Sequence, residues 1–401
     1  MFPGRNLMSD LVHDKSIMLV LLCCLILGFV IGLSLLTVPL YTLALSDSSL
    51  ILALVVGALP LTGALLSLAS GAFSDYFGRR AVIIGSSAIV MAGCVTLALA
   101  KTYHWLVVGQ VLLGLGDVSF YIAAFTLLME LAPPGRQYGL QGLGYGVWQV
   151  GAILGPFVGG YVVEFAGFRE AFLLAGILTL LGLIVATRIE STANAHPSVG
   201  SLLTCLAEYH KGAWRLLTGN TAVLWVNVVG AFATMTWPTM GGSFYLAFLT
   251  TLGFSSSNAG LLTSVRVVVL TLSQLSLGLV GRRTSMLGLA LAATVLGALT
   301  VGITPLLDTV PLIAVVGCIG GLSGITWPIL TGILAGNTDR TERSMSVALL
   351  SLSWALTTPV ALFAVGVMVD RISLSFAFFL TGAFVTLCSG LLWIGAKSKL
   401  V

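Results

Sequence analysis

Long, continuous apolar runs separated by short polar segments dominate this sequence. An α-helix needs about 20 apolar residues to cross a bilayer, and many of the runs reach that length. Strands of a membrane β-barrel would instead alternate apolar and polar residues over short segments. With 58% hydrophobic and 8% charged residues, the chain cannot cover the surface of a water-soluble domain. We therefore predict an all-α membrane protein with twelve transmembrane helices.

The predicted spans follow the apolar runs, with boundaries accurate to a few residues. They cover residues 17–43, 49–73, 81–100, 104–130, 139–163, 170–188, 217–248, 257–280, 284–304, 309–335, 346–369 and 373–396. The longest polar segment divides them into two sets of six. We predict an N-terminal bundle over residues 1–188, a cytoplasmic linker over 189–216 and a C-terminal bundle over 217–401.

Within the linker, apolar residues from Leu202 to Trp214 recur near helical spacing. A helix with one apolar face can lie along the inner leaflet of the membrane. The sequence does not separate this lateral amphipathic helix from a simple linker, so both interpretations stay open.

Positively charged residues distinguish the two sides of the predicted membrane region. Segments that stay in the cytoplasm carry an excess of Lys and Arg. Of the 18 Lys and Arg residues, Lys101, Arg169 and Arg371 fall on the side opposite the N-terminus, and Arg266 lies inside a span. We therefore predict a multi-pass protein of the cell (inner) membrane with both termini in the cytoplasm.

Short matches recur in the two halves of the chain. Matches that keep the same order in both halves indicate an internal duplication. They pair Gly160-Tyr-Val-Val-Glu164 with Gly366-Val-Met-Val-Asp370, Gly78-Arg79-Arg80 with Gly281-Arg282-Arg283, and Thr37-Val38-Pro39 with Thr236-Trp237-Pro238. We therefore predict that the two six-helix bundles are related by pseudo-symmetry.

A polar segment between the second and third spans reads Gly71-Ala-Phe-Ser-Asp75-Tyr-Phe-Gly78-Arg79-Arg80. Glycine allows close helix approach and turns with unusual dihedral angles, which suits Gly71 and Gly78. The segment resembles the loop 2–3 signature of the major facilitator superfamily, although Tyr76 stands where a basic residue is usual. The resemblance implies a fold of two six-helix bundles that transports a small molecule.

The resemblance also implies that this segment latches one conformation. Span 11 begins on the cytoplasmic side, and the positive end of its helix dipole attracts a carboxylate such as Asp75. Arg79 and Arg80 then pair with Asp339 or Glu342. The alternative is that the segment only enforces the membrane topology.

The fifth span contains Gly146 and, after eight intervening residues, Gly155-Pro156-Phe-Val-Gly159-Gly160. Glycines four residues apart let another helix come close, and a proline bends a helix by removing a backbone hydrogen bond. Such a face suits two halves that rock against each other, and ordinary tight packing is the alternative. The string resembles the antiporter motif of the superfamily's drug exporters, which implies export rather than uptake.

The fourth span begins Gln110-Val-Leu-Leu-Gly114-Leu-Gly116-Asp117. In the exporters an Arg usually stands four residues before the first of these glycines, at the place of Gln110. Asp117 lies on roughly the same helical face and is the only carboxylate that we predict near the bilayer centre. A charge there is costly unless it faces a cavity or a partner. We predict proton coupling at Asp117 and a substrate contact at Gln110; the alternative is a structural Asp117 bonded to Ser119.

Arg266 in the eighth span is the only basic residue well inside a predicted span. A guanidinium does not lose its proton in a protein, so it must face water, an anion or Asp117. We predict that Arg266 binds an anionic group of the substrate or pairs with Asp117, and a snorkelling or structural role is the alternative.

Aromatic residues interrupt several spans. In the superfamily, spans 1, 4, 7 and 10 line the central cavity, and Tyr121, Trp237 and Trp327 fall in three of these. Aromatic walls suit a lipophilic or ring-containing substrate. We predict substrate contacts at these three residues, with packing or lipid contact as the alternative for each.

Several function classes lack support in the sequence. The six cysteines and four histidines show no metal-ligand spacing, so we expect no metal and no cofactor. The formal net charge of +4 does not indicate nucleic-acid binding. No phosphate-binding glycine loop or supported catalytic triad is present, so we predict that the protein is not an enzyme.

The resemblance and the residues together predict a proton-coupled antiporter that exports a small amphipathic or aromatic compound by alternating access. Its expected partners are the substrate, protons and membrane lipids, and we expect a monomer. A proton symporter or facilitator for a sugar or an organic anion is the first alternative. A lipid flippase or a non-transporting membrane sensor is the second.

Overall fold

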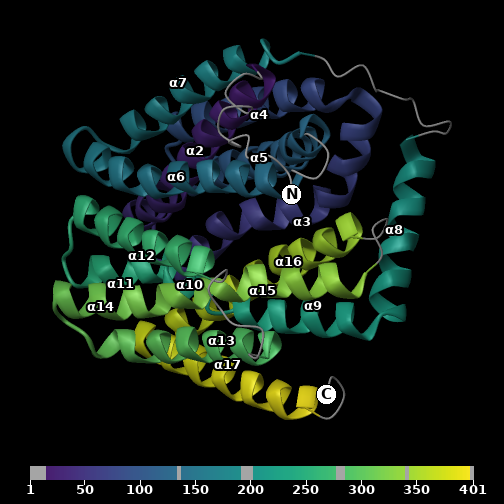
Figure 1. Ribbon diagram of the computed structural model, residues 1–401. Helices are drawn as coiled ribbons and strands as arrows, with labels where there is room; N and C mark the ends of the chain where they lie inside the picture. Colours follow the sequence, from purple (N-terminus) through teal and green to yellow (C-terminus); the bar gives the residue numbers. More distant parts are fainter. Residues whose placement is uncertain (1–14, 133–136, 191–201, 277–284, 339–342, 398–401) are drawn as a thin grey trace.

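Figure 1 shows the computed structural model of the protein, which describes residues 15–132, 137–190, 202–276, 285–338 and 343–397. Every regular element among these residues is a helix, and eleven helices or joined helices are long and apolar enough to cross a membrane. A twelfth is reached if His210–Gly219 and Thr221–Thr251, which meet at an angle of 97°, are counted together as one span. The predicted all-α membrane fold with twelve spans in two bundles is therefore confirmed.

The first half of the chain forms six long helices that pack together in the upper part of Figure 1. They are α2 (Lys15–Leu45), α3 (Ser49–Phe77), α4 (Arg79–Ala98), α5 (Tyr103–Leu131), α6 (Gln137–Phe165) and α7 (Phe168–Ala186). Each matches one predicted span to within a few residues, because the apolar runs end at polar or glycine-containing turns.

The second half is more interrupted. Its elements are α9 (Thr221–Thr234), α10 (Trp237–Met240), α11 (Ser243–Thr251), α12 (Ser256–Ser276), α13 (Met286–Ile303), η2 (Thr304–Leu306), α14 (Val310–Gly321), η3 (Leu322–Ile325), α15 (Thr326–Asn337), α16 (Arg343–Arg371) and α17 (Leu374–Lys397). Two of the six spans in this half therefore contain a break.

The seventh span is not the single helix that the apolar run over 217–248 predicts. Pro238 stands in the first turn of the four-residue helix α10 and lacks the backbone N–H that would continue α9. Gly241 then ends α10, and Gly242 is the N-cap of α11. Hydropathy does not detect this break, because the residues on both sides of it are equally apolar.

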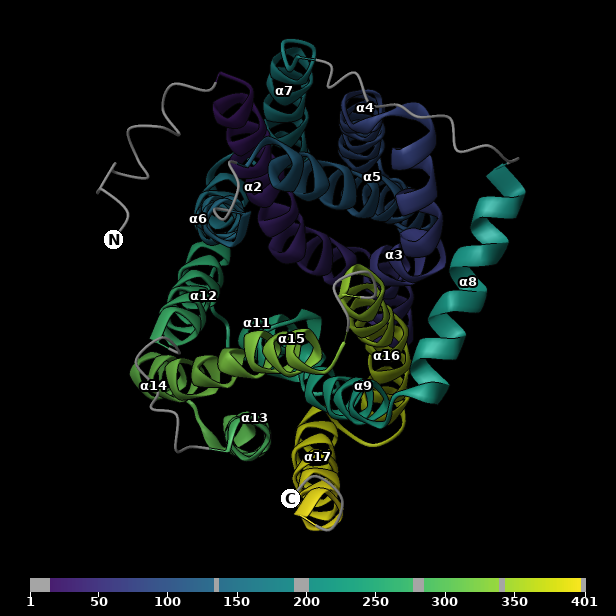
Figure 2. The same cartoon turned by 45° about the vertical axis from the view of Figure 1, so that its right-hand side comes forward.

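Helix α8 (Leu202–Gly219) connects the two halves and lies along one side of the molecule (Figure 2). It contacts α3 and α16, which belong to different halves. Ala213 and Leu216 are buried, whereas the Trp214 side chain is 68% exposed. The helix thus has one packed face and one free face.

Three clusters of buried apolar residues hold the molecule together. The first lies within the N-terminal half, and the third lies among α8, α9, α13, α15 and α16. The second combines residues of both halves, such as Leu36 and Val56 from the first with Phe244 and Leu362 from the second. Burial of apolar surface therefore joins the two bundles directly.

Candidate functional site

The two halves meet chiefly along three helix pairs, α2 with α11, α3 with α16 and α6 with α12, and α2 with α12 and α3 with α11 touch as well. Close contacts between them lie where α3 and α12 begin and where α6 and α16 end. We call this the joined end of the molecule. The opposite end, where α3 ends and α4 begins, is called the loop end.

Asp370, near the C-terminus of α16, caps the N-terminus of α3 across the joined end. Its carboxylate accepts the backbone N–H of Ser49 at 2.8 Å and of Leu50 at 3.1 Å, and the Ser48 hydroxyl at 3.2 Å. The first N–H groups of a helix have no partner within the helix, and the helix dipole favours a negative charge there. Asp370 therefore links the second half to the first.

Glu164 makes the corresponding link in the opposite direction. It lies at the C-terminal end of α6 and accepts the backbone N–H of Ser257, in the first turn of α12, at 2.9 Å. Each half thus supplies one carboxylate that caps a helix of the other half. The repeated Gly-x-x-x-acid sequences supply both caps, a role that the sequence comparison did not reveal.

The glycines of the same repeats allow the close approach. A Cβ atom at Gly160 would collide with the Ser256 carbonyl oxygen, and one at Gly366 would lie 2.9 Å from the Ser49 carbonyl oxygen. The α6–α12 pair is closed further by the Ser264 hydroxyl, which donates to the Ile153 carbonyl at 2.8 Å. The two contacts between the halves, α6 with α12 and α3 with α16, which we call the seams, are therefore built in the same way.

Asp117, the predicted proton-coupling residue, lies in the middle of α5 and is half-buried. Among the described residues it has no hydrogen bond or ion pair. The predicted alternative partner, Ser119, instead shares a hydrogen bond with Ser70 of α3 at 3.0 Å. Asp117 lies within electrostatic range of Tyr121, whose ring is 37% exposed.

Tyr121, the neighbour of Asp117, belongs to a group of aromatic side chains. The Tyr121 ring centroid lies 4.5 Å from that of Phe125 and 6.5 Å from that of Trp148 on α6. Tyr145 of α6 completes the group, 6.0 Å from Trp148.

Gln110 lies two turns from Asp117 on α5 and is only 2% exposed. Its side-chain oxygen has no hydrogen-bond partner among the described residues. The structure shows no contact between Gln110 and Asp117, and the predicted substrate contact at Gln110 stays a prediction.

Arg266 of α12 is 4% exposed and lies in the opposite half from Asp117. The described residues contain no ion pair between them. The guanidinium packs against the backbone of Gly241, at the break between α10 and α11, and lies within electrostatic range of Tyr245. A pairing of Arg266 with Asp117 is therefore absent from this conformation of the described residues.

Comparison with known proteins now identifies the architecture. The family model of the Major Facilitator Superfamily matches residues 20–277, well over half of the chain. The chain belongs to this superfamily. Membership in this superfamily indicates a membrane transporter rather than an enzyme.

Individual relatives of the transporter match over shorter stretches. The methylenomycin A resistance protein of Bacillus subtilis is 32% identical over 156 residues, which are 37% of this chain and 33% of that protein. Citrate exporter 1 of Aspergillus niger is 27% identical over 157 residues, 38% of this chain and 29% of that protein. The matched parts thus span a third or less of these curated relatives.

A solved structure extends the likeness to nearly the whole fold. The crystal structure of a D-xylose-proton symporter superposes with a TM-score of 0.72 at 18% identity, over 94% of this chain and 97% of the symporter. At this identity the likeness shows the superfamily fold and nothing about the substrate.

The loop 2–3 segment of the transporter pairs within its own half. Gly78 ends α3 and precedes α4 with a φ of 85°, a left-handed conformation that favours glycine, as predicted. Arg79 pairs with Glu130 of α5 at 3.1 Å, and Arg80 donates to the Thr187 carbonyl at 2.7 Å. A side chain at Gly71 would meet open space, so the close approach predicted there is wrong for this structure.

The predicted latch falls partly outside the described residues. The side chain of Asp75, and all of Asp339 and Glu342, lie outside the part of the chain that the structure describes. The latch therefore stays a prediction.

The span-5 string serves two different packings. Side chains at Gly155 and Gly159 would meet Leu33 of α2, so these glycines pack within the N-terminal half. Gly160 faces α12 of the other half, and the Pro156 carbonyl lies against Gly260. A Cβ atom at Gly146 would have no neighbour within 4 Å. The face that we expected between the halves is therefore limited to Pro156 and Gly160.

Trp237 and Trp327 occupy matching places beside the two helix breaks. Trp237 opens α10, and its carbonyl accepts the N–H of Gly242 at 3.0 Å. Trp327 stands in the first turn of α15, after the short helix η3, and packs on the third apolar cluster. Both rings are half-buried, and the structure shows neither in contact with Asp117.

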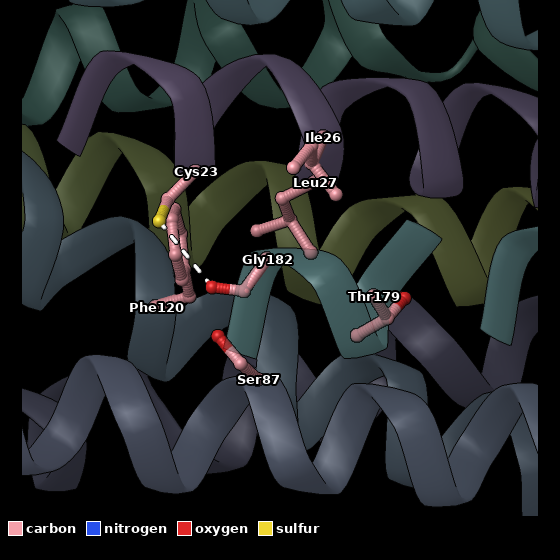
Figure 3. Close-up of a pocket in the computed structure, with 7 residues that line it drawn as sticks. All are labelled: Cys23, Ile26, Leu27, Ser87, Phe120, Thr179 and Gly182. Atoms are coloured by element: carbon pink, nitrogen blue, oxygen red, sulfur yellow. Dashed lines mark hydrogen bonds between the residues drawn. The ribbon is translucent and has the colours of Figure 1, made fainter. Parts of the chain in front are cut away.

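A small cavity lies inside the N-terminal half (Figure 3). Residues of α2, α4, α5 and α7 line it, and the Cys23 thiol beside it donates to the Gly182 carbonyl at 3.6 Å. None of the predicted substrate contacts lines this cavity. It lies within one half, away from the seams, and we assign it to packing.

Proposed function

We propose that this transporter is a proton-coupled antiporter that exports a small amphipathic or aromatic compound by alternating access. Two relatives with exporting or resistance names, the methylenomycin A resistance protein and citrate exporter 1, support export. The span-5 string that resembles the exporters' antiporter motif supports it as well.

The observation that carries the proposal is Asp117, a half-buried carboxylate at mid-span without an ion pair among the described residues. Such a group is costly in a membrane protein unless it has a function. When the bundles separate on one side, water reaches Asp117 and it ionises. When they close around it, the neutral protonated form is favoured, so each cycle carries a proton.

The orientation follows from the distribution of Lys and Arg. We propose that both termini face the cytoplasm and that the protein resides in the cell (inner) membrane. The loop end, with Arg79 and Arg80, then faces the cytoplasm, and the joined end faces outward. In this orientation the linker helix α8 lies on the inner leaflet.

The division into bundles over residues 1–188 and 217–401 is part of the same proposal. The moving units are the two bundles, and the contacts across the joined end break when that end opens. Asp117 and Tyr121 belong to the first unit, and Arg266, Trp237 and Trp327 to the second. The substrate lies between the two sets.

The alternatives differ from this proposal in the direction of transport or in the access of lipid to the binding site. A symporter or facilitator would take up its substrate down an inward proton gradient. A flippase needs a groove open to lipid beside α6 or α12. The Ser264–Ile153 hydrogen bond and the Gly160–Ser256 approach close that seam near its joined end.

Proton flux in proteoliposomes tests the proposal. Vesicles loaded with the pH indicator pyranine receive ethidium, an aromatic cation, or 8-anilinonaphthalene-1-sulfonate, an aromatic anion. We expect the wild type to exchange protons for at least one probe. The Asp117→Asn variant should lose this exchange at least about tenfold, because its side chain cannot carry the proton.

Glu170→Gln is the matched control, because it removes an exposed carboxylate at the start of α7, in the same half and outside the proposed path. Unchanged proton exchange in Asp117→Asn would disprove the assignment of Asp117. Probe uptake with the proton gradient would favour the symporter. A wild type that moves neither probe nor protons would favour the sensor.

A further inference from the structure

Arg266 is a buried cation whose compensating charge is missing from the described part of the chain. Its side chain is 4% exposed, and its Nε atom has no hydrogen-bond partner there. The ion pair that the described residues do contain joins Arg79 to Glu130, and both of these residues belong to the other half of the molecule. A buried guanidinium without an anion is costly, because desolvation is not offset by pairing.

A second cluster of unpaired donors lies at the same break. The nine-residue helix α11 begins at Ser243, and its first backbone bond to the cap runs from Leu246 N–H to the Gly242 carbonyl at 3.2 Å. Within the described residues, the N–H groups of Ser243, Phe244 and Tyr245 have no acceptor outside the helix. These three residues are at most 3% exposed.

The Ser243 hydroxyl adds another unpaired polar group. It is buried at 1% exposure, and the described residues offer it no partner. Buried polar groups in folded proteins are nearly always hydrogen-bonded, so each exception calls for an absent partner. Two such atoms of the described residues, Arg266 Nε and Ser243 Oγ, lie at the start of this one helix, whereas the others, Gln110 Oε1 among them, lie elsewhere.

The buried guanidinium and the unpaired donors of α11 lie next to each other. The Arg266 guanidinium lies against Gly241, the residue directly before the cap of α11. The N-terminal end of a helix and a guanidinium both attract negative charge. Transporter helices that break at mid-membrane commonly present such an end to an anionic group.

We propose that the α10–α11 break is an oxyanion-binding site, in which Arg266, Ser243 and the first N–H groups of α11 hold a carboxylate. Its planar oxygens match the fork of the guanidinium. That this carboxylate belongs to the transported compound rests on the function proposed above, whereas the existence of the site does not. Asp117 is not the anion here, since it lies in the other half without an ion pair to Arg266.

Thermal unfolding of the detergent-solubilised protein tests the site. The protein at low ionic strength is titrated with sodium benzoate, with the uncharged isostere benzamide, or with sodium chloride. We expect benzoate to raise the unfolding temperature and benzamide to leave it unchanged. Chloride should act only at much higher concentration, because it cannot use both arms of the guanidinium.

Variants locate the effect. Arg266→Gln should weaken the benzoate response at least about tenfold, since it removes a charge-assisted pair of hydrogen bonds. Ser243→Ala should weaken it less, and it keeps the test decisive if Arg266→Gln fails to fold. Arg169→Gln, which removes an exposed arginine of α7 in the other half, should respond like the wild type.

Three results would overturn the proposal. They are a wild type that does not respond to benzoate, an equal response to chloride or benzamide, and an unchanged response in both Arg266→Gln and Ser243→Ala. The outcome of the proton-flux assay does not depend on the outcome of the benzoate titration. Benzoate binding that depends on Arg266, without proton exchange, would reject the antiporter and leave the site intact.

Discussion

The two ends of the molecule use their polar residues in opposite ways. At the joined end, Asp370 and Glu164 each reach into the other half and cap a helix there. At the loop end, Arg79 pairs with Glu130 inside the N-terminal half. In the C-terminal half, Asn220 caps α9 and donates to the Asn337 carbonyl at 2.8 Å. Among the described residues, these bonds link the two halves at the joined end and lie within a half at the loop end.

This difference indicates which contacts a conformational change must break. The bonds across the joined end involve exposed carboxylates and backbone donors, which water can replace at modest cost. The glycine contacts beneath them are steric and allow no substitute. The polar caps therefore adjust the stability of the joined state, and the glycines decide whether that state can form at all.

The largest effect is expected from Gly160→Leu. The new side chain would collide with the Ser256 backbone, which cannot move without displacing α12. We expect the joined state to become the minor one. Spin labels at the exposed positions Phe165 and Asn258, measured by double electron–electron resonance, should report a longer distance.

Gly146→Leu is the matched control for this prediction. It lies on the same helix, and its new side chain would meet open space. If Gly160→Leu leaves the distance distribution as it is in the wild type, the glycines are not what permits the joined state.

A smaller effect is expected from Asp370→Ala. It removes the acceptor for two backbone N–H groups of α3, and loss of a helix cap costs about 1 kcal/mol or less at an exposed site. The ratio of joined to separated molecules should fall by up to about fivefold. Spin labels at Asp47 and Ile372 measure it.

Asp370→Asn should retain part of the link, because its amide oxygen still accepts a hydrogen bond. A joined state as populated in Asp370→Ala as in the wild type would show that the cap contributes nothing to the seam.

The smallest effect is expected from Arg79→Gln. The ion pair with Glu130 is partly exposed, and such pairs contribute about 0–1 kcal/mol. Since it lies within one half, we expect no change in the distances across the joined end and at most a small change in unfolding temperature. A clear shift of the joined end would contradict the comparison and favour the latch.

Much of the fold follows from hydropathy alone. The ends of α5 and α6 lie within two residues of the runs that predicted them, because long apolar segments must become membrane helices. Hydropathy did not predict the break in span 7. The pair Gly241-Gly242, three residues after Pro238, is the signal that could have revealed it.

The site was less predictable, for a physical reason. Asp117 and Arg266 stand out because each is a charge in an apolar run. What each one contacts depends on how separate helices pack. The sequence repeat marked Glu164 and Asp370 as related, yet nothing in it states that each faces a helix N-terminus of the other half.

Helix α3 connects the two ends that differ. It begins under the Asp370 cap, ends at Gly78, and is 29 residues long. At 1.5 Å per residue it is a lever arm of about 43 Å, so that a pivot of about 10° at the capped end would swing its far tip by about 7 Å. A small tilt therefore moves the capped end very little. The same tilt moves the far end of α3 enough to open an entrance for a small solute.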